Sequence, residues 1–150
     1  MRCFRGKGMP IILTKVRQPQ RRKDILRRGR LVEALAQNIY RKLTFLSAPA
    51  GYGKTSLLVD FASEVEAAVC WYHIGIADSD LTVFVGYLIA AFQQRFPDLG
   101  KNLESLLYTG APPAPRVLAV ELVNEISARV DELCLLVLDD YHLVGEMPAV

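Results

Sequence analysis

The chain has few cysteines and no long apolar run, and each absence argues against a class of protein. Three cysteines, Cys3, Cys70 and Cys134, occur among 150 residues. Their odd number and wide spacing suggest neither a disulfide framework nor a zinc cluster, and such usage fits a reducing compartment. The longest apolar runs, such as residues 83–92, fall short of the ~18–20 residues that a membrane span needs. We therefore expect a cytoplasmic protein that makes no contact with a membrane.

Acidic and aromatic residues are nearly absent from the first 30 positions. Eleven of the 18 Lys and Arg residues lie there, against one acid, Asp24, and one aromatic, Phe4. The lack of aromatics argues against a platform on which single-stranded nucleic acid stacks. The basic excess is typical of a solvated lead-in, and the alternative is a segment directed at the phosphates of a nucleotide or a nucleic acid. We expect residues 1–28 to form an irregular basic lead-in, with Met9 as a plausible alternative start.

The rest of the chain alternates between two hydrophobic patterns. Apolar residues make up 51% of the sequence, which is enough for a packed core. Apolar residues at four-residue spacing predict helices, and short continuous apolar runs predict strands buried on both faces of a parallel sheet. We predict helices at 29–40, 53–65, 81–96 and 116–130, and strands at 43–47, 68–76 and 133–138. This order predicts an α/β layered sandwich.

The strongest motif joins the strand predicted at 43–47 to the helix predicted at 53–65. It reads Ser47-Ala48-Pro49-Ala50-Gly51-Tyr52-Gly53-Lys54-Thr55-Ser56. Gly51 and Gly53 allow a tight turn that aims backbone N–H groups at an anion, and the positive end of the following helix attracts the same anion. Lys54 supplies a mobile charge for the β- and γ-phosphates, and Thr55 supplies a hydroxyl group for Mg²⁺. Residues 48–56 are therefore the predicted binding segment for ATP or ADP.

One position departs from the usual spacing of a phosphate-binding loop. The pattern G-x-x-x-x-G-K-[ST] has its first glycine where this chain has Ala48. A small residue is tolerated there if the loop keeps its geometry, and Gly51 can supply the flexibility. The alternative is a Gly/Pro-rich turn that carries a surface lysine. A strand before the motif and a helix after it favour the phosphate-binding loop.

A second half-site follows about 85 residues later. The run Leu135-Leu136-Val137-Leu138-Asp139-Asp140 is an apolar strand that ends in two acids. Ligands of open α/β sheets bind at this end of a strand, and phosphoryl transfer needs Mg²⁺ and an ordered water. Asp139 is the candidate Mg²⁺ ligand, through water. Asp140, which would orient or activate the attacking water, and Lys54 are the candidate catalytic residues. The alternative is a buried strand that ends in a solvated acidic pair.

Other chemistry-bearing residues are sparse. His73 and His142 are the only histidines, and each is isolated in the sequence. We expect them to have structural or surface roles rather than catalytic or metal-binding ones. Trp71 and Tyr72 fall in a predicted core strand, and we expect them to pack there.

Several segments together resemble a known family. They are residues 13–16, Pro19 with Arg22, and residues 28–31, 41–44, 47–55, 87–91 and 136–143. In that order they resemble the start of the MalT-like, LuxR-type transcriptional activators, which are P-loop ATPases of the STAND class. The most specific pieces are residues 48–55 and Asp139-Asp140-Tyr141-His142. Ala48 in place of glycine is usual in this family.

The resemblance implies a signal-gated ATPase switch. ADP would hold the full protein inactive, inducer and ATP would favour self-association, and a C-terminal helix-turn-helix domain would bind DNA. Arg28 resembles a residue of the lead-in that packs near the adenine, although Gly29 stands where the family commonly has proline.

The resemblance also implies that the family continues for hundreds of residues beyond the acidic strand. We therefore expect residues 29–150 to be the N-terminal portion of a P-loop NTPase domain that is truncated after that strand. Its three-layer sandwich would hold about three parallel strands and lack a later, central one. ATP hydrolysis is expected only in a full-length protein.

Two alternatives stay open at this point. A small self-sufficient P-loop kinase has a suitable length, but it would need a lid with arginines after the acidic strand. A basic interaction module would contact DNA through residues 1–30 and carry a vestigial P-loop.

Overall fold

The computed structural model describes residues 9–22, 24–108, 110–111 and 113–144, and the chain divides into two units. The sheet unit consists of Met1–Arg17 and Ala68–Val150, and the loop unit consists of Gln18–Ala67. The start of the expected basic lead-in, residues 1–8, and the last six positions lie outside the described residues.

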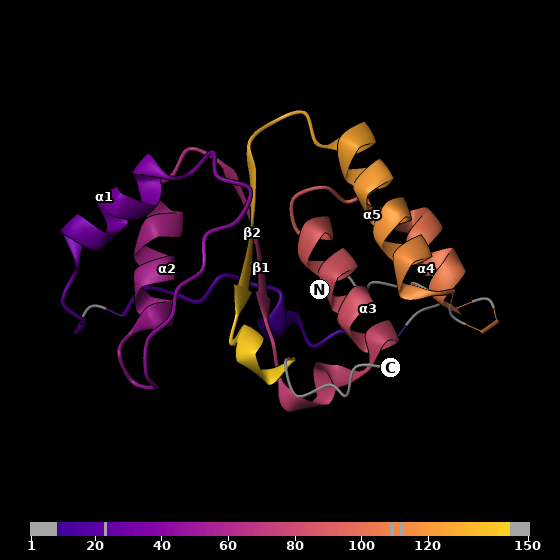
Figure 1. The fold of residues 1–150 in the computed structure, drawn as a ribbon, viewed down its shortest axis with the longest axis horizontal. Helices are drawn as coiled ribbons and strands as arrows, with labels where there is room; N and C mark the ends of the chain where they lie inside the picture. The colour runs from indigo at the N-terminus through magenta and orange to yellow at the C-terminus, as the bar shows by residue number, and fades with distance from the viewer. Residues whose placement is uncertain (1–8, 23, 109, 112, 145–150) are drawn as a thin grey trace. The chain divides into compact units, whose positions relative to one another are not determined.

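Two parallel strands form the centre of the sheet unit. Strand β1 (Ala68–His73) pairs with β2 (Cys134–Asp139) in a register that runs from Ala68 opposite Cys134 to His73 opposite Asp139 (Figure 1). Beyond β1, the Ile74 N–H donates to the carbonyl of Asp139 at 3.0 Å. The predictions of strands at 68–76 and 133–138 are confirmed, although β1 ends three residues earlier and β2 starts and ends one residue later than predicted. Trp71 and Tyr72 are 1% and 0% exposed, which confirms their predicted place in the core.

Three helices pack with this sheet. They are α3 (Leu81–Gln93), α4 (Lys101–Tyr108) and α5 (Pro115–Arg129). The helices predicted at 81–96 and 116–130 are confirmed. Asp80 caps α3, because its Oδ1 accepts from the N–H groups of Thr82 at 2.8 Å and Val83 at 3.1 Å. Helix α4 was not predicted, since its eight residues carry only Leu103 and Leu107 as a buried stripe. Among the described residues, no helix combines the length and apolar character that crossing a membrane requires.

Helix α3 lies at the middle of the core. Its residues 85–92 are all buried. Tyr87 and Leu88 belong to one apolar cluster with Tyr72 of β1, while Val85 and Ile89 belong to another with Leu103, Leu107 and Leu118. The helix therefore joins the strands to α4 and α5, and this packing holds the strand ends in place.

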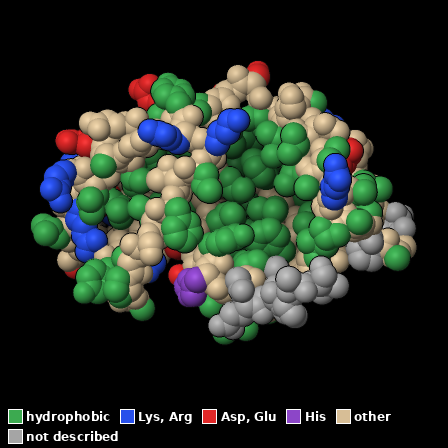
Figure 2. Space-filling model, in the orientation of Figure 1, with side chains coloured by type: hydrophobic (Ala, Val, Ile, Leu, Met, Phe, Trp, Pro, Cys, Tyr) green, Lys and Arg blue, Asp and Glu red, His purple; other side chains and the backbone are tan. Residues whose placement is uncertain are grey.

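The sheet is covered unevenly. Figure 2 shows a broad apolar area over β2, α3 and α5. Leu136 of β2 is 37% exposed, and Val120 and Val123 of α5 are 54% and 63% exposed. The prediction that 133–138 is buried on both faces is therefore wrong for part of β2, although β1 is buried from Ala68 to Tyr72.

A buried ion pair fastens the start of the chain to the sheet unit. Lys15, at the end of the short 3-10 helix η1 (Leu13–Lys15), donates from Nζ to both carboxylate oxygens of Asp78. Asp78 lies in η2 (Ile76–Ser79), is 1% exposed and also accepts from the Gly75 N–H at 2.8 Å. The Lys15 ammonium stands 4.5 Å from the ring centre of Tyr87. Burial raises the pKa of Tyr72, and the charge of Asp78 raises it further.

A second buried carboxylate closes the start of α4. Glu125 of α5 is 4% exposed. Its Oε2 accepts from the Gly100 N–H at 2.6 Å, and its Oε1 accepts from the N–H groups of Asn102 at 3.1 Å and Leu103 at 3.2 Å. Arg129 lies one turn further along α5, with Nε 3.4 Å from Oε2. Glu125 thus serves as the cap that the sequence of α4 does not itself provide.

The loop unit is built on two helices. Helix α1 (Gly29–Gln37) and helix α2 (Lys54–Glu64) confirm the predictions at 29–40 and 53–65 within three residues. Two arginines of the basic lead-in bind acids of α2. Arg21 Nε donates to Oδ1 of the buried Asp60 at 2.6 Å, and Arg27 Nη2 lies 2.6 Å from the Glu64 carboxylate.

The strand predicted at 43–47 is wrong. These residues have no regular secondary structure, and Leu43 and Phe45 are 80% and 73% exposed. A β-strand needs a neighbour that takes up its backbone hydrogen bonds, and the two strands in the described part of the chain pair with each other. The sheet therefore has two strands there instead of the expected three. The α/β class is confirmed. Residues 43–47 have the apolar pattern of a strand, but they pair with neither β1 nor β2.

Replacing Lys15 with methionine should destabilise the fold. The change leaves the Asp78 carboxylate buried without its cation, so we expect a loss of about 3–5 kcal/mol in the free energy of unfolding. Denaturant titration followed by circular dichroism measures it. Arg17→Met, two residues away and exposed, should change little. Adding Asp78→Asn to Lys15→Met should recover part of the loss, and equal losses for the single and double variants would contradict the ion-pair role.

Replacing Glu125 with glutamine should loosen α4. One oxygen acceptor becomes an NH₂ group, so at least one buried backbone N–H loses its partner, at a cost of about 1–3 kcal/mol. Amide hydrogen exchange of residues 101–104 measures the local effect. Glu121→Gln on the same helix is the matched control. Unchanged exchange in Glu125→Gln would contradict the capping role.

Candidate functional site

The predicted phosphate-binding loop has the backbone that its glycines were expected to allow. Gly51 has φ 80°, and Gly53 has φ 73° and ψ 35°, so both occupy the left-handed region. Helix α2 begins immediately afterwards at Lys54, and the Leu57 N–H donates to the Gly53 carbonyl at 3.0 Å. The first turn of such a helix directs N–H groups that lack helical acceptors towards an anion. Two glycines with positive φ therefore lead directly into the first turn of a helix.

Lys54 folds back over this loop. Its Nζ donates to the carbonyls of Ala48 at 2.8 Å and Pro49 at 3.2 Å. These carbonyls hold the ammonium group across the loop entrance, where the oxygens of a phosphate could replace them as acceptors. Thr55 and Ser56 follow in α2, and both are partly buried.

Arg28 binds the same loop. Its Nη1 donates to the Tyr52 carbonyl at 2.6 Å. A Cβ atom placed on Gly53 would lie 3.4 Å from Arg28 Nη2, an ordinary contact distance, so the guanidinium lies beside Gly53. The structure therefore places Arg28 beside Tyr52 and Gly53 of the predicted binding segment.

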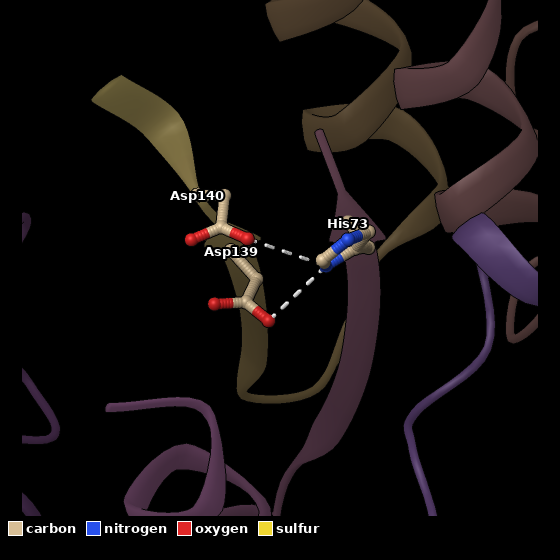
Figure 3. Close-up of side chains that lie close together, drawn as sticks. All are labelled: His73, Asp139 and Asp140. Atoms are coloured by element: carbon tan, nitrogen blue, oxygen red, sulfur yellow. Dashed lines mark hydrogen bonds and ion pairs between the residues drawn. The ribbon is translucent and has the colours of Figure 1, made fainter. Parts of the chain in front are cut away.

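The acidic pair stands at the carboxyl end of β2. Asp139, the last residue of the strand, is 3% exposed. Asp140 follows with φ 58°, which is uncommon for a residue with a side chain, and it precedes the short 3-10 helix η3 (Tyr141–Leu143). The left-handed turn lets the two carboxylates stand side by side at the end of the strand, as Figure 3 shows.

His73, which is isolated in the sequence, lies against this pair in the fold. Its Nδ1 lies 3.3 Å from Asp139 Oδ2 and 3.9 Å from Asp140 Oδ2 (Figure 3). The cause is the strand register, which places His73 at the end of β1 opposite Asp139. His142 is more remote, with Nδ1 4.0 Å from Asp140 Oδ1 and its side chain 70% exposed. The three side chains of His73, Asp139 and Asp140 are here called the strand-end cluster.

The register also joins two cysteines. Cys70 and Cys134, which are 64 positions apart, have their sulfur atoms 3.8 Å apart, and both are free thiols. The hydrogen bond between them, together with burial, raises the pKa of Cys70. The same bond lowers the pKa of Cys134. Wide spacing in the sequence therefore did not mean separation in the fold.

The predicted site residues fall into two groups. Arg28 and residues 48–56 come together within the loop unit, whereas Asp139 and Asp140 meet His73 within the sheet unit. The first group offers cations and backbone N–H groups, and the second offers carboxylates and an imidazole.

Comparison with known proteins gives relatives over most of the chain. The chain is 34% identical over 133 residues to the HTH-type transcriptional regulator MalT of Vibrio parahaemolyticus. This match covers 89% of the chain and 14% of that protein. MalT of Serratia proteamaculans is 33% identical, with 89% and 15% covered. The serine/threonine-protein kinase PknK of Mycobacterium tuberculosis is 29% identical over 140 residues, with 91% and 12% covered.

These matches support a relationship to MalT-like regulators. The chain spans about 14% of the length of the first of these curated relatives. No family model matches the chain.

Replacing Gly53 with alanine should disturb the start of α2. The left-handed backbone at this position is about 1–2 kcal/mol less favourable for a residue with a side chain. We expect faster amide exchange in the first turn of α2, measured by hydrogen exchange. Gly29→Ala is the control, because a Cβ there meets nothing within 4 Å and its φ is not positive. Equal exchange in both variants would contradict the strained geometry.

Proposed function

We propose that this chain is the ATP- and ADP-binding portion of a signal-gated transcriptional regulator of the MalT-like, STAND class. The observation that carries the proposal is the loop before α2. Two left-handed glycines, the bound ammonium of Lys54 and the start of α2 lie within one short segment. This combination suits the β- and γ-phosphates of a nucleotide, which need backbone N–H groups and a mobile cation.

The metal that accompanies the nucleotide would be Mg²⁺, and each unit by itself contains a candidate oxygen donor for it. Thr55 offers a hydroxyl group and Asp139 a buried carboxylate at a strand end, and both are donor types that Mg²⁺ takes. When bound, Mg²⁺ would neutralise charge on the phosphates. Asp140 would orient the attacking water, and Lys54 would hold the phosphates in position.

The contacts of the basic lead-in favour the nucleotide-binding proposal over the alternative of a DNA-binding module. Lys15 binds Asp78, Arg21 binds Asp60, Arg27 binds Glu64, and Arg28 binds the Tyr52 carbonyl. Cations that are paired with acids or carbonyls in this way are less available to bind DNA phosphates than the charges of a solvated tail. Their role is structural, and for Arg28 it extends to the nucleotide loop.

The wider assembly belongs to the same proposal. Residues 29–150 would be the N-terminal portion of a P-loop NTPase domain. Self-association and DNA binding would occur in a longer protein, the latter through a separate domain. The similarity to MalT proteins, which are HTH-type transcriptional regulators, motivates this step.

The nucleotide-binding role can be tested on the 150-residue chain with Lys54→Met. Removing the ammonium should weaken the binding of a fluorescent ADP analogue by about tenfold or more, because one charge-assisted contact to phosphate is lost. Fluorescence anisotropy measures the dissociation constant. Lys42→Met, which removes an exposed lysine outside the loop, is the matched control. Equal affinities for the parent chain and Lys54→Met would contradict the proposal.

A further inference from the structure

The strand-end cluster combines an imidazole with two carboxylates. His73 ends β1, Asp139 ends β2, and Asp140 is the next residue. Their potential ligand atoms all lie within 4.8 Å of one another. Figure 3 shows the three side chains facing one another across the two strand ends. Three metal-binding groups therefore converge on one small volume.

His73 and Asp139 form a long hydrogen bond, and the distances in the cluster also fit a shared ion. His73 Nδ1 is 3.3 Å from Asp139 Oδ2, longer than the roughly 2.9–3.0 Å common for such a bond, and 3.9 Å from Asp140 Oδ2. Two atoms bound to one ion at about 2.0–2.2 Å lie about 3–4 Å apart. Both separations fall in that range, so small side-chain movements would bring the three groups onto one ion.

The fold restrains the ligands and leaves a path to them. Parallel pairing fixes His73 opposite Asp139, and the hydrogen bond from Ile74 N–H to the Asp139 carbonyl continues the pairing past the cluster. The Asp139 side chain is 3% exposed, while those of His73 and Asp140 are 47% and 34% exposed. An ion could enter from the solvent side and keep water in its remaining positions.

The donor set selects the kind of metal. Mg²⁺ prefers oxygen ligands in a near-ideal octahedron, whereas an imidazole nitrogen favours first-row transition ions. Two carboxylates balance the charge of a divalent ion. We propose that His73, Asp139 and Asp140 form a binding site for one divalent first-row transition ion, of the Mn²⁺, Co²⁺ or Zn²⁺ class.

The proposed metal site takes none of its ligands from the predicted nucleotide loop. All three ligands belong to the sheet unit, and none belongs to residues 48–56. It shares Asp139 and Asp140 with the Mg²⁺ and water-orienting roles proposed above. A transition ion coordinated there would occupy those carboxylates, so it would compete with their roles towards a Mg²⁺-bound nucleotide.

The test is a titration of the nucleotide-free 150-residue chain with Co²⁺ alone, followed by calorimetry and by the visible spectrum. We expect one saturable site, a spectrum of nitrogen and oxygen ligation, and tighter binding of Co²⁺ than of Mg²⁺. His73→Ala should weaken Co²⁺ binding by at least about tenfold and leave Mg²⁺ binding unchanged. His142→Ala, which removes the other histidine near Asp140, should bind Co²⁺ as the parent chain does. Asp140→Asn should also weaken Co²⁺ binding.

Several outcomes would overturn the proposal. They are equal Co²⁺ affinity in the parent chain and His73→Ala, equal loss in His142→Ala, absence of saturable binding, or an intense sulfur charge-transfer band, which would place the ion at Cys70 and Cys134. Lys54→Met keeps all three ligands and should retain Co²⁺ binding. If Lys54→Met has parental nucleotide affinity while His73→Ala loses Co²⁺, the nucleotide proposal fails and the metal site stands.

Discussion

The parallel register of β1 and β2 is the constraint on which the rest of the sheet unit depends. Pairing His73 with Asp139 aligns the carboxyl ends of both strands. The same register brings Cys70 and Cys134 together near the other end. A shift of one residue would turn every side chain of one strand to the opposite face, so the apolar pattern of β1 against α3 also fixes the strand-end cluster. The chemistry at the strand ends is therefore a consequence of core packing.

Most of the elements could be predicted because their signals are local. Asp80 before α3 is a capping residue, and Pro115 suits the first turn of a helix. The motif of the predicted phosphate-binding loop is equally local, since Gly51, Gly53 and Lys54 lie within four positions of one another. In such features the interacting residues are neighbours in the sequence, so the local sequence is sufficient to predict them.

The contacts that prediction missed join residues far apart in the sequence. His73 and Asp139 are separated by 66 positions, and Lys15 and Asp78 by 63. The residues next to His73 or Lys15 in the sequence do not indicate the partner, because strand register and packing determine which residue lies opposite. The wrong strand at 43–47 has a related cause. Leu43 and Phe45 have the pattern of a strand, but a strand exists only with a neighbour, and a neighbour is a long-range property.

The basic residues near the start of the chain pair with buried acids in the fold, although their sequence pattern is typical of a solvated tail. A cluster of bases at the start of a chain is typical of a solvated tail, whose charges are screened by salt. Here Lys15 and Arg21 each meet an acid with almost no exposure, Asp78 at 1% and Asp60 at 5%. A buried carboxylate without a cation would be costly, so these acids require their basic partners.

The lead-in therefore belongs structurally to both units, with Lys15 in the sheet unit and Arg21, Arg27 and Arg28 in the loop unit. Arg28 extends that role to the loop before α2, because the guanidinium that binds the Tyr52 carbonyl also borders Gly53. A substitution in the lead-in should consequently act first on stability and on loop geometry, and only through them on any ligand.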